Sequence, residues 1–217
     1  MEDIKKVLIW PKWLRISHWL LASGISFELI SAWLIQNAHV DINFWSDWHV
    51  MIGQVLSLVI LVRLFYLIKP GAGYWRQLIP NHSQLNIIKQ TLLFYASLGR
   101  LQLPDWHLHN PLWQPLYLLV LLLILLITIS GLLFGNPTRL LWYSVSGWHG
   151  FLAQSLAYFI LAHIAAVLIH DWNSESGHIS AMLSGFKYFQ IKPLQKFEQE
   201  TKQQAEQSVS LDKLLKK

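Results

Sequence analysis

Two histidines in the last long apolar segment of the chain, His149 and His163, are 14 residues apart. An α-helix turns about 100° and rises about 1.5 Å per residue, so the two imidazoles would face within about 40° of each other, about 21 Å apart along the axis. Imidazole is a common metal ligand and exchanges protons near neutral pH. Ionisable side chains inside a membrane are costly and indicate functional sites. The spacing therefore predicts binding chemistry at two depths of one helix.

The composition indicates that this helix lies in a membrane. The 217 residues are 53% hydrophobic and only 13% charged, whereas soluble domains carry about 25% charged residues. Four apolar runs approach the roughly 20 residues that span a bilayer; they are residues 14–35, 49–68, 112–134 and 148–170. A soluble bundle is disfavoured, because residues 117–127 are all apolar and leave no face for water. We expect an all-α integral membrane fold, a bundle of four transmembrane helices.

The basic residues predict the topology. If all four runs span, 16 of the 17 lysines and arginines fall on one side, and only Arg139 falls on the other. By the positive-inside rule both termini are then cytoplasmic. The net charge of +5 thus reports topology rather than a nucleic-acid partner. The first run is too long for a cleavable signal peptide and lacks a small-residue cleavage site, so we expect it to be retained.

Outside the four runs, two segments carry patterns of their own. Residues 84–100 have apolar side chains at helical spacing, which predicts an amphipathic helix on the cytoplasmic membrane surface. The C-terminal tail is rich in Gln, Lys and Glu, and we expect a mobile or loosely held segment. The sequence thus predicts a membrane domain over residues 1–190 and a polar cytoplasmic tail over 191–217. The chain has no cysteine, which excludes disulfides, cysteine-ligated iron–sulfur clusters and c-type haem attachment.

Helix direction decides which histidines can meet. The first helix runs outward and places His18 near the cytoplasmic side, whereas the second runs inward and places His49 near the outer side. The fourth also runs inward, with His149 near the outer side and His163 about 10 Å from its cytoplasmic end. The predicted pairs are therefore His49 with His149 and His18 with His163.

Two facing imidazoles can hold a flat macrocycle through its metal, and haem iron accepts histidine as an axial ligand. With both axial positions filled, such a haem has no open site for oxygen or substrate, which favours electron transfer. Small residues near the ligands, such as Gly53, would let the ring approach the backbone. Anionic propionates favour basic partners. Arg15 and Arg63 are suitably placed for an inner haem, and Arg139 for an outer one.

Several residues also have other interpretations. A single histidine, glycine or serine in a membrane helix commonly serves helix packing, and Arg63 is placed to snorkel to the headgroups. His170, seven residues after His163, faces the same way and is the alternative inner ligand, although it is expected at the water boundary. Glu28 fits a proton relay or, preferably, a protonated carboxyl group hydrogen-bonded within the bundle. Three further histidines are expected in solvated loops: His39, His82 and His178.

Short motifs accompany the four histidines in a fixed order. They are Arg15-x-x-His18-Trp19, His49-x-x-x-Gly53, His109-Asn110-Pro111-Leu112, Ser130-Gly131 and Ala181-Met182-x-x-Gly185-x-Lys187. The set resembles the bacterial di-haem cytochrome b family that includes cytochrome b561 and the cytochrome b subunits of nickel–iron hydrogenases and thiosulfate reductases. The resemblance covers the first helix to about residue 187. Trp113 departs from it, because the family often has a small residue there, and this affects the expected local packing and any quinone pocket.

The resemblance implies two b-type haems per chain, a quinone or quinol on one side, and a periplasmic or membrane redox partner protein. A quinone site is expected near the inner haem, with His107 or His109 exchanging protons, since quinone reduction couples electrons to protons. The alternative is that residues 109–111 only end the loop and cap the third helix.

The predicted function is transmembrane electron transfer between the quinone pool and a partner redox protein in a respiratory chain. The chain would act as a subunit in the bacterial inner membrane rather than as a complete enzyme. One alternative is a stand-alone quinol oxidase of the cytochrome b561 type that acts on a small oxidant. Another is a metal transporter or membrane anchor without haem. A transporter should place acidic or broken-helix sites at the midplane, whereas these histidines lie in two outer layers.

Overall fold

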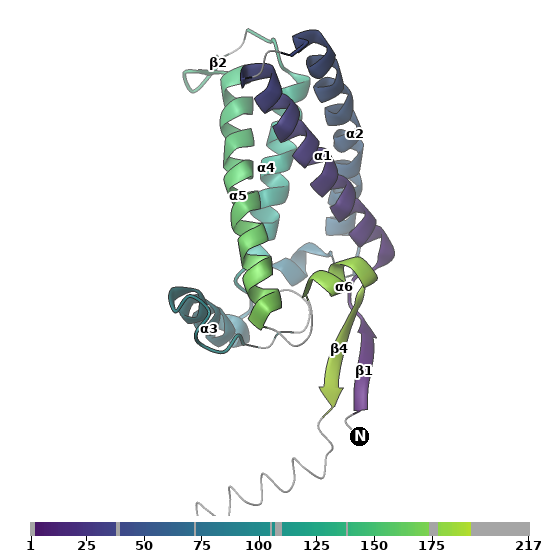
Figure 1. Cartoon of the computed structure of the whole chain (residues 1–217), viewed down its shortest axis with the longest axis vertical. Helices are drawn as coiled ribbons and strands as arrows, with labels where there is room; N and C mark the ends of the chain where they lie inside the picture. Colours follow the sequence, from purple (N-terminus) through teal and green to yellow (C-terminus); the bar gives the residue numbers. More distant parts are fainter. Residues whose placement is uncertain are drawn as a thin grey trace, which may run out of the picture.

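The computed structural model describes residues 3–37, 40–71, 73–104, 106, 110–137, 139–173 and 178–191. Within these ranges four helices are long and apolar enough to cross a membrane, which confirms the predicted number of spanning segments. They are α1 (Lys12–Asn37), α2 (Ile42–Ile68), α4 (Gln114–Leu132) and α5 (Val145–Asn173). Figure 1 shows them along the long axis of the molecule.

Apolar side chains from all four helices form the core of this bundle. α1 packs on α2, α2 on α4, and α4 on α5. Close approach of α1 and α2 requires Gly24, because an added Cβ would lie 2.5 Å from Leu56 Cδ2. The outward faces expose large apolar side chains, as expected of helices that contact lipid. The other core residues are Leu21, Ile25, Ile60, Leu121, Ile124 and Leu156.

α2 begins seven residues before the predicted start of the second run. The Asp41 carboxylate accepts hydrogen bonds from the backbone N–H groups of Asn43 and Phe44, at 3.0 and 3.2 Å, and so forms an N-cap. Hydropathy identified only the apolar part of the helix and missed its polar first turns. Consequently His49 lies about two turns inside α2 rather than at its first residue.

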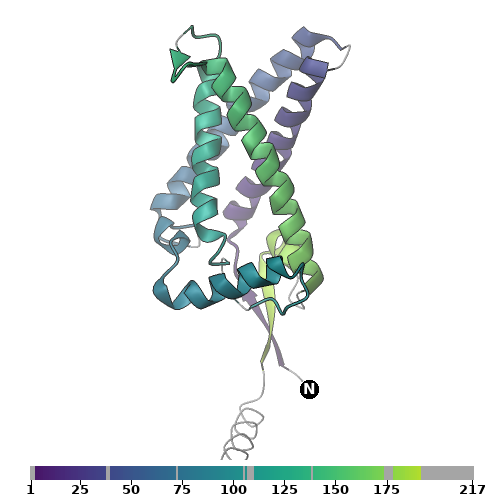
Figure 2. The same cartoon turned by 90° about the vertical axis from the view of Figure 1, so that its left-hand side faces the viewer.

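The two ends of the bundle carry different structures (Figures 1 and 2). We call one the ribbon end, where the strands β1 (Asp3–Leu8) and β4 (Phe186–Ile191) pair antiparallel. The helices α3 (Leu85–Ala96) and α6 (His178–Ser184) lie at the same end. Two short 3-10 helices precede α3 in the chain, η1 (Trp75–Leu78) and η2 (His82–Gln84). α3 confirms the helix predicted within residues 84–100. The other end is the hairpin end, named for β2 (Arg139–Leu140) and β3 (Tyr143–Ser144).

The ribbon corrects the all-α expectation. Its strands are six residues each and pair from Asp3 opposite Ile191 to Leu8 opposite Phe186. Such short segments at opposite ends of the chain give no local signal of their pairing. The Lys6 ammonium lies 4.1 Å from the centre of the Phe186 ring and adds a cation–π contact. The ribbon thus ties the segment just before the predicted tail to the N-terminal arm, and residues 192–217 lie outside the described ranges.

Candidate functional site

Two histidines face each other between α2 and α5 toward the hairpin end. The ring centroids of His49 and His149 are 6.3 Å apart, with an interplanar angle of 82°. Both side chains are half-buried. We call them the hairpin-end pair.

Each ring of this pair uses Nδ1 for contacts within the protein. His49 Nδ1 lies 2.7 Å from Glu28 Oε2 and 2.9 Å from Ser31 Oγ. His149 Nδ1 lies 3.1 Å from the carbonyl oxygen of Ile127, which can only accept, so Nδ1 must carry the proton. The Nε2 atom of His149 is then unprotonated and can bind a metal. Metal-ligating histidines commonly donate their other ring N–H to a carboxylate or carbonyl in this way.

Both residues of the motif Ser130-Gly131 lie against the His149 ring. The Ser130 hydroxyl donates to the Ile127 carbonyl and lies 3.1 Å from His149 Nδ1, where it can accept. At Gly131 an added Cβ would lie 3.1 Å from His149 Cε1. The serine therefore helps to fix the ring, and the glycine makes room for it.

A second pair lies between α1 and α5, nearer the ribbon end. The ring centroids of His18 and His163 are 6.4 Å apart, with an interplanar angle of 65°. The Phe159 ring stacks on His163 at an interplanar angle of 13°. Among the described residues no hydrogen-bond partner reaches either imidazole, so packing orients this ribbon-end pair. Both predicted pairings in depth are therefore observed, while the ligand role of the four histidines stays a prediction.

The separations suit two imidazoles on one metal. An imidazole nitrogen binds a metal at about 2.0–2.1 Å, and its ring centre lies about 1.1 Å behind that nitrogen, so opposite ligands have centroids roughly 6.3 Å apart. Both pairs match this value, at 6.3 and 6.4 Å. In the described ranges no group of three or more His, Cys, Asp or Glu side chains is placed to hold a metal ion. Two imidazoles alone fit a metal that brings its own equatorial ligands, as haem does.

Arg63 gives a second test of that fit. It is only 4% exposed, on α2, and it lies close enough to His18 for their charges to interact. Its guanidinium lies 5.4 Å from the centre of the Tyr117 ring, yet Nε and Nη1 have no hydrogen-bond partner among the described residues. A buried charge without a counter-charge is strongly unfavourable. This guanidinium therefore fits an anionic group of a bound ligand, such as a haem propionate.

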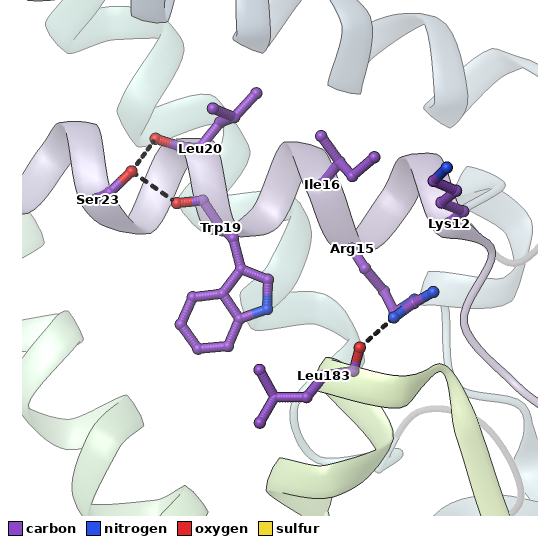
Figure 3. Close-up of a pocket in the computed structure, with 7 residues that line it drawn as sticks. All are labelled: Lys12, Arg15, Ile16, Trp19, Leu20, Ser23 and Leu183. Atoms are coloured by element: carbon purple, nitrogen blue, oxygen red, sulfur yellow. Dashed lines mark hydrogen bonds between the residues drawn. The ribbon is translucent and has the colours of Figure 1, made fainter.

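Arg15 makes a contact that the sequence did not predict. Its Nη1 donates to the Leu183 carbonyl of α6, beside a groove of about 580 Å³ lined also by Lys12, Ile16 and Trp19 (Figure 3). Gly185 is needed at this turn, because its φ is +90° and an added Cβ would lie 3.0 Å from Arg15 Nε. Arg15 thus joins α1 to the end of α6.

The other predicted residues have varied positions. Arg139 is exposed in β2 at the hairpin end. Gly53 lies beside Glu28, since an added Cβ would be 4.0 Å from Glu28 Oε1. His82 is exposed in η2, as expected. His178 begins α6 rather than lying in a loop. Three histidines fall outside the described residues: His39, His107 and His109.

His170 was predicted at the water boundary, but it is only 7% exposed and packs against α3. Its Nε2 lies 2.7 Å from the Tyr95 hydroxyl, which also accepts from Trp113 Nε1 at 2.9 Å. Burial raises the pKa of Tyr95, so the hydroxyl stays protonated and can donate to His170. Nε2 of His170 is thus engaged by Tyr95, and His18 faces His163, which together favour His163 over His170. The unusual Trp113 takes part in docking α3.

Glu28 and Ser31 are the site residues that sequence reasoning missed. Glu28 was recognised as an ionisable residue in a spanning helix but was not connected with His49. The connection depends on the rotation of α1 against α2, which no local pattern reports. Ser130 and Gly131 were noted as a motif without a role.

The fold and the site define a class of protein: a multi-pass membrane bundle that presents two pairs of facing histidines. The model of the prokaryotic cytochrome b561 family matches residues 9–185, and the chain belongs to this family. It is therefore a membrane electron-transfer subunit that binds b-type haem. A relative from Azospira oryzae, described as a putative protein-methionine-sulfoxide reductase subunit YedZ1, is 29% identical over 151 residues, which are 63% of this chain and 71% of that protein. No solved structure matches the chain.

Proposed function

We propose that the chain carries electrons across the membrane through two bis-histidine b haems and links the quinone pool to a partner redox protein. The hairpin-end pair would hold one haem and the ribbon-end pair the other. The observation that carries this proposal is the centroid separation of 6.3 and 6.4 Å in the two pairs. Bound haem supplies a one-electron iron couple that needs no open coordination position.

The residues of the chain would hold and orient the two groups. At the hairpin end, the Ile127 carbonyl keeps the proton of His149 on Nδ1 and leaves Nε2 to the iron. At the ribbon end, Arg63 would meet a propionate, with Arg15 as a second cation because its Nε is buried without a hydrogen-bond partner among the described residues. Arg139 would serve the hairpin-end propionates from an exposed position, and Gly53 would let the hairpin-end ring approach the backbone of α2.

The ribbon end would face the cytoplasm. The support is the charge distribution, with 16 of the 17 lysines and arginines in segments that connect at this end or belong to it. The protein would thus be a multi-pass protein of the bacterial inner membrane with both termini inside.

A quinone site would lie near the ribbon-end pair, with His107 or His109 exchanging protons. Two buried side chains directly after this segment support the placement. Asn110 and Gln114 are each 6% exposed, and Asn110 Nδ2 and Gln114 Oε1 have no hydrogen-bond partner within the described ranges. A donor and an acceptor without protein partners, four residues apart in the chain, suit a carbonyl or hydroxyl group of a quinone or quinol.

A separate redox protein would be the other electron partner. The support is that the relative YedZ1 is described as a subunit of a reductase. By this likeness the chain would be the membrane subunit of a larger assembly rather than a stand-alone quinol oxidase.

The test is a haem count on the purified full-length chain. A pyridine haemochrome assay should give two b haems per chain, and the reduced-minus-oxidised spectrum should show low-spin bis-histidine haem. One haem per chain, or none, would overturn the proposal. A carbon monoxide adduct on the reduced protein would also contradict it, because that ligand needs an open axial position.

A further inference from the structure

The two histidine pairs differ in the charge that acts on them. At the hairpin end a carboxylate oxygen, Glu28 Oε2, lies 2.7 Å from His49 Nδ1. At the ribbon end no carboxylate contacts either imidazole in the described ranges, and the nearby charged group is the Arg63 guanidinium, which is of opposite sign. The same two ligands are thus placed beside a negative group at one end and a positive group at the other.

The surroundings of Glu28 direct its charge onto His49. The Glu28 side chain is 16% exposed, and its other oxygen, Oε1, is buried without a hydrogen-bond partner among the described residues. Ser31 is fully buried, and its hydroxyl donates to the Glu28 backbone carbonyl at 3.1 Å, so that its lone pairs face His49 Nδ1 at 2.9 Å. The Nδ1–H of His49 therefore has two acceptors, and Nε2 remains free for a metal.

We propose that Glu28 is a positioning residue that makes the hairpin-end site the lower-potential site of the two. This inference rests on the proposed function. A charge-assisted hydrogen bond to Nδ1 makes the imidazole a stronger electron donor, and a buried negative charge stabilises the more positive, oxidised iron. Arg63 acts in the opposite sense at the ribbon end, although a propionate would offset part of its charge. The His149 contacts are to neutral oxygens and have a smaller effect.

The consequence is a direction for spontaneous electron transfer within the chain. One electron would pass from the hairpin-end site to the ribbon-end site, so that the first iron would be oxidised from ferrous to ferric and the second reduced from ferric to ferrous. No bond forms or breaks, Glu28 stays a carboxylate, and His49 keeps the proton on Nδ1. The downhill direction would therefore run from the hairpin end to the ribbon end.

The test is a spectroelectrochemical titration of the haem-loaded full-length chain with Glu28→Gln. Glutamine keeps an oxygen acceptor for His49 Nδ1 but removes the charge. We expect the haem count to stay at two and the lower-potential transition to rise, so that the reduced-to-oxidised ratio at a fixed potential increases at least tenfold, which is about 59 mV for one electron. The upper transition should stay in place. The transition is assigned to the hairpin end by repeating the titration in a His163→Ala background, which leaves only that site.

A matched control removes a carboxylate at the same end without a histidine contact. Asp47 is exposed near the start of α2, and Asp47→Asn should shift the lower transition much less than Glu28→Gln, because solvent screens exposed charge. If Glu28→Gln lost the hairpin-end haem, Glu28→Asp would serve instead. It is one methylene shorter, so it should lengthen the 2.7 Å contact and still raise the lower transition.

The outcomes separate the two proposals. The role of Glu28 would be overturned if both Glu28 variants kept two haems and their lower transition did not move, or if only the upper transition moved. The electron-transfer proposal would stand in either case. Equal shifts in Glu28→Gln and Asp47→Asn would also overturn it. Fewer than two haems in the unaltered chain would overturn the proposed function itself.

Discussion

The two histidine pairs of this bundle have the same ring chemistry and nearly the same separation, but they are held in different ways. Hydrogen bonds to Nδ1 orient both rings of the hairpin-end pair. In the ribbon-end pair, Phe159 stacks on His163, and the rings have no hydrogen-bond partner within the described residues. Packing orients a ring, whereas a hydrogen bond at Nδ1 orients it and also makes it a stronger electron donor. Two sites that look equivalent by ligand and spacing can therefore differ in chemistry.

The two histidine pairs also differ in the charged side chains that lie near them. The hairpin-end pair has an internal carboxylate, and its predicted propionate partner, Arg139, is exposed. The ribbon-end pair has a buried guanidinium at Arg63. At the hairpin end the nearby charge acts on a histidine ligand, whereas at the ribbon end it would act on the propionate of the bound haem. Substitutions at the hairpin end should therefore change the reduction potential, and substitutions at the ribbon end should change haem binding.

The largest expected effect is the loss of one haem at a time. His49→Ala and His163→Ala should each lower the pyridine haemochrome count from two to one, because their pairs lie about 21 Å apart along the bundle. Electron paramagnetic resonance should show that a different low-spin signal disappears in each variant. If either variant lost both haems, the two sites would not be independent and the comparison would fail.

The next effect should come from Arg63→Met. Removing one partner of a buried ion pair costs about 3–5 kcal/mol, so haem binding at the ribbon end should weaken by roughly 150- to 5,000-fold. The measurement is the rate of haem transfer from the purified variant to a haem-scavenging protein. Arg139→Met is the control, and its effect on the hairpin-end haem should be much smaller, because Arg139 is exposed. Equal effects of the two variants would show that burial of the guanidinium is not what matters.

A steric change tests the hairpin-end pair without altering charge. In Gly131→Ala the added Cβ would lie 3.1 Å from His149 Cε1, so the ring must shift. Overpacking of this kind costs about 1–3 kcal/mol, which should release the hairpin-end haem roughly 5- to 150-fold faster. Gly150→Ala is the matched control, since nothing lies within 4 Å of its added Cβ. A change at the ribbon-end signal, or equal behaviour of the two variants, would contradict the assigned role of Gly131.

Much of this architecture could be predicted from the sequence because it depends on periodicity and direction. Apolar runs identify the four spanning helices, and their alternation in direction matches His49 with His149 and His18 with His163. Neither argument needs the rotation of one helix against another. The family resemblance agrees with the match of the family model over residues 9–185.

What the sequence could not predict depends on that rotation or on distant pairing. The Glu28–His49 contact is set by the α1–α2 crossing, where Gly24 meets Leu56. The β1–β4 ribbon joins the two ends of the described chain. His170 was expected at the water boundary because it ends an apolar run, but α3 folds over it.

The smallest expected effect on the haem sites comes from Tyr95→Phe at the ribbon end. The change removes a hydroxyl that bridges His170 and Trp113, and each hydrogen bond contributes about 0.5–1.5 kcal/mol. The amides of α3 should therefore exchange with deuterium faster, while the haem count and both potentials stay unchanged, because His170 is not a ligand. Tyr158→Phe, at an exposed tyrosine of α5, should leave exchange in α3 unaffected. Loss of the ribbon-end haem in Tyr95→Phe would instead indicate that His170, and not His163, binds the iron, since Tyr95 contacts His170 directly.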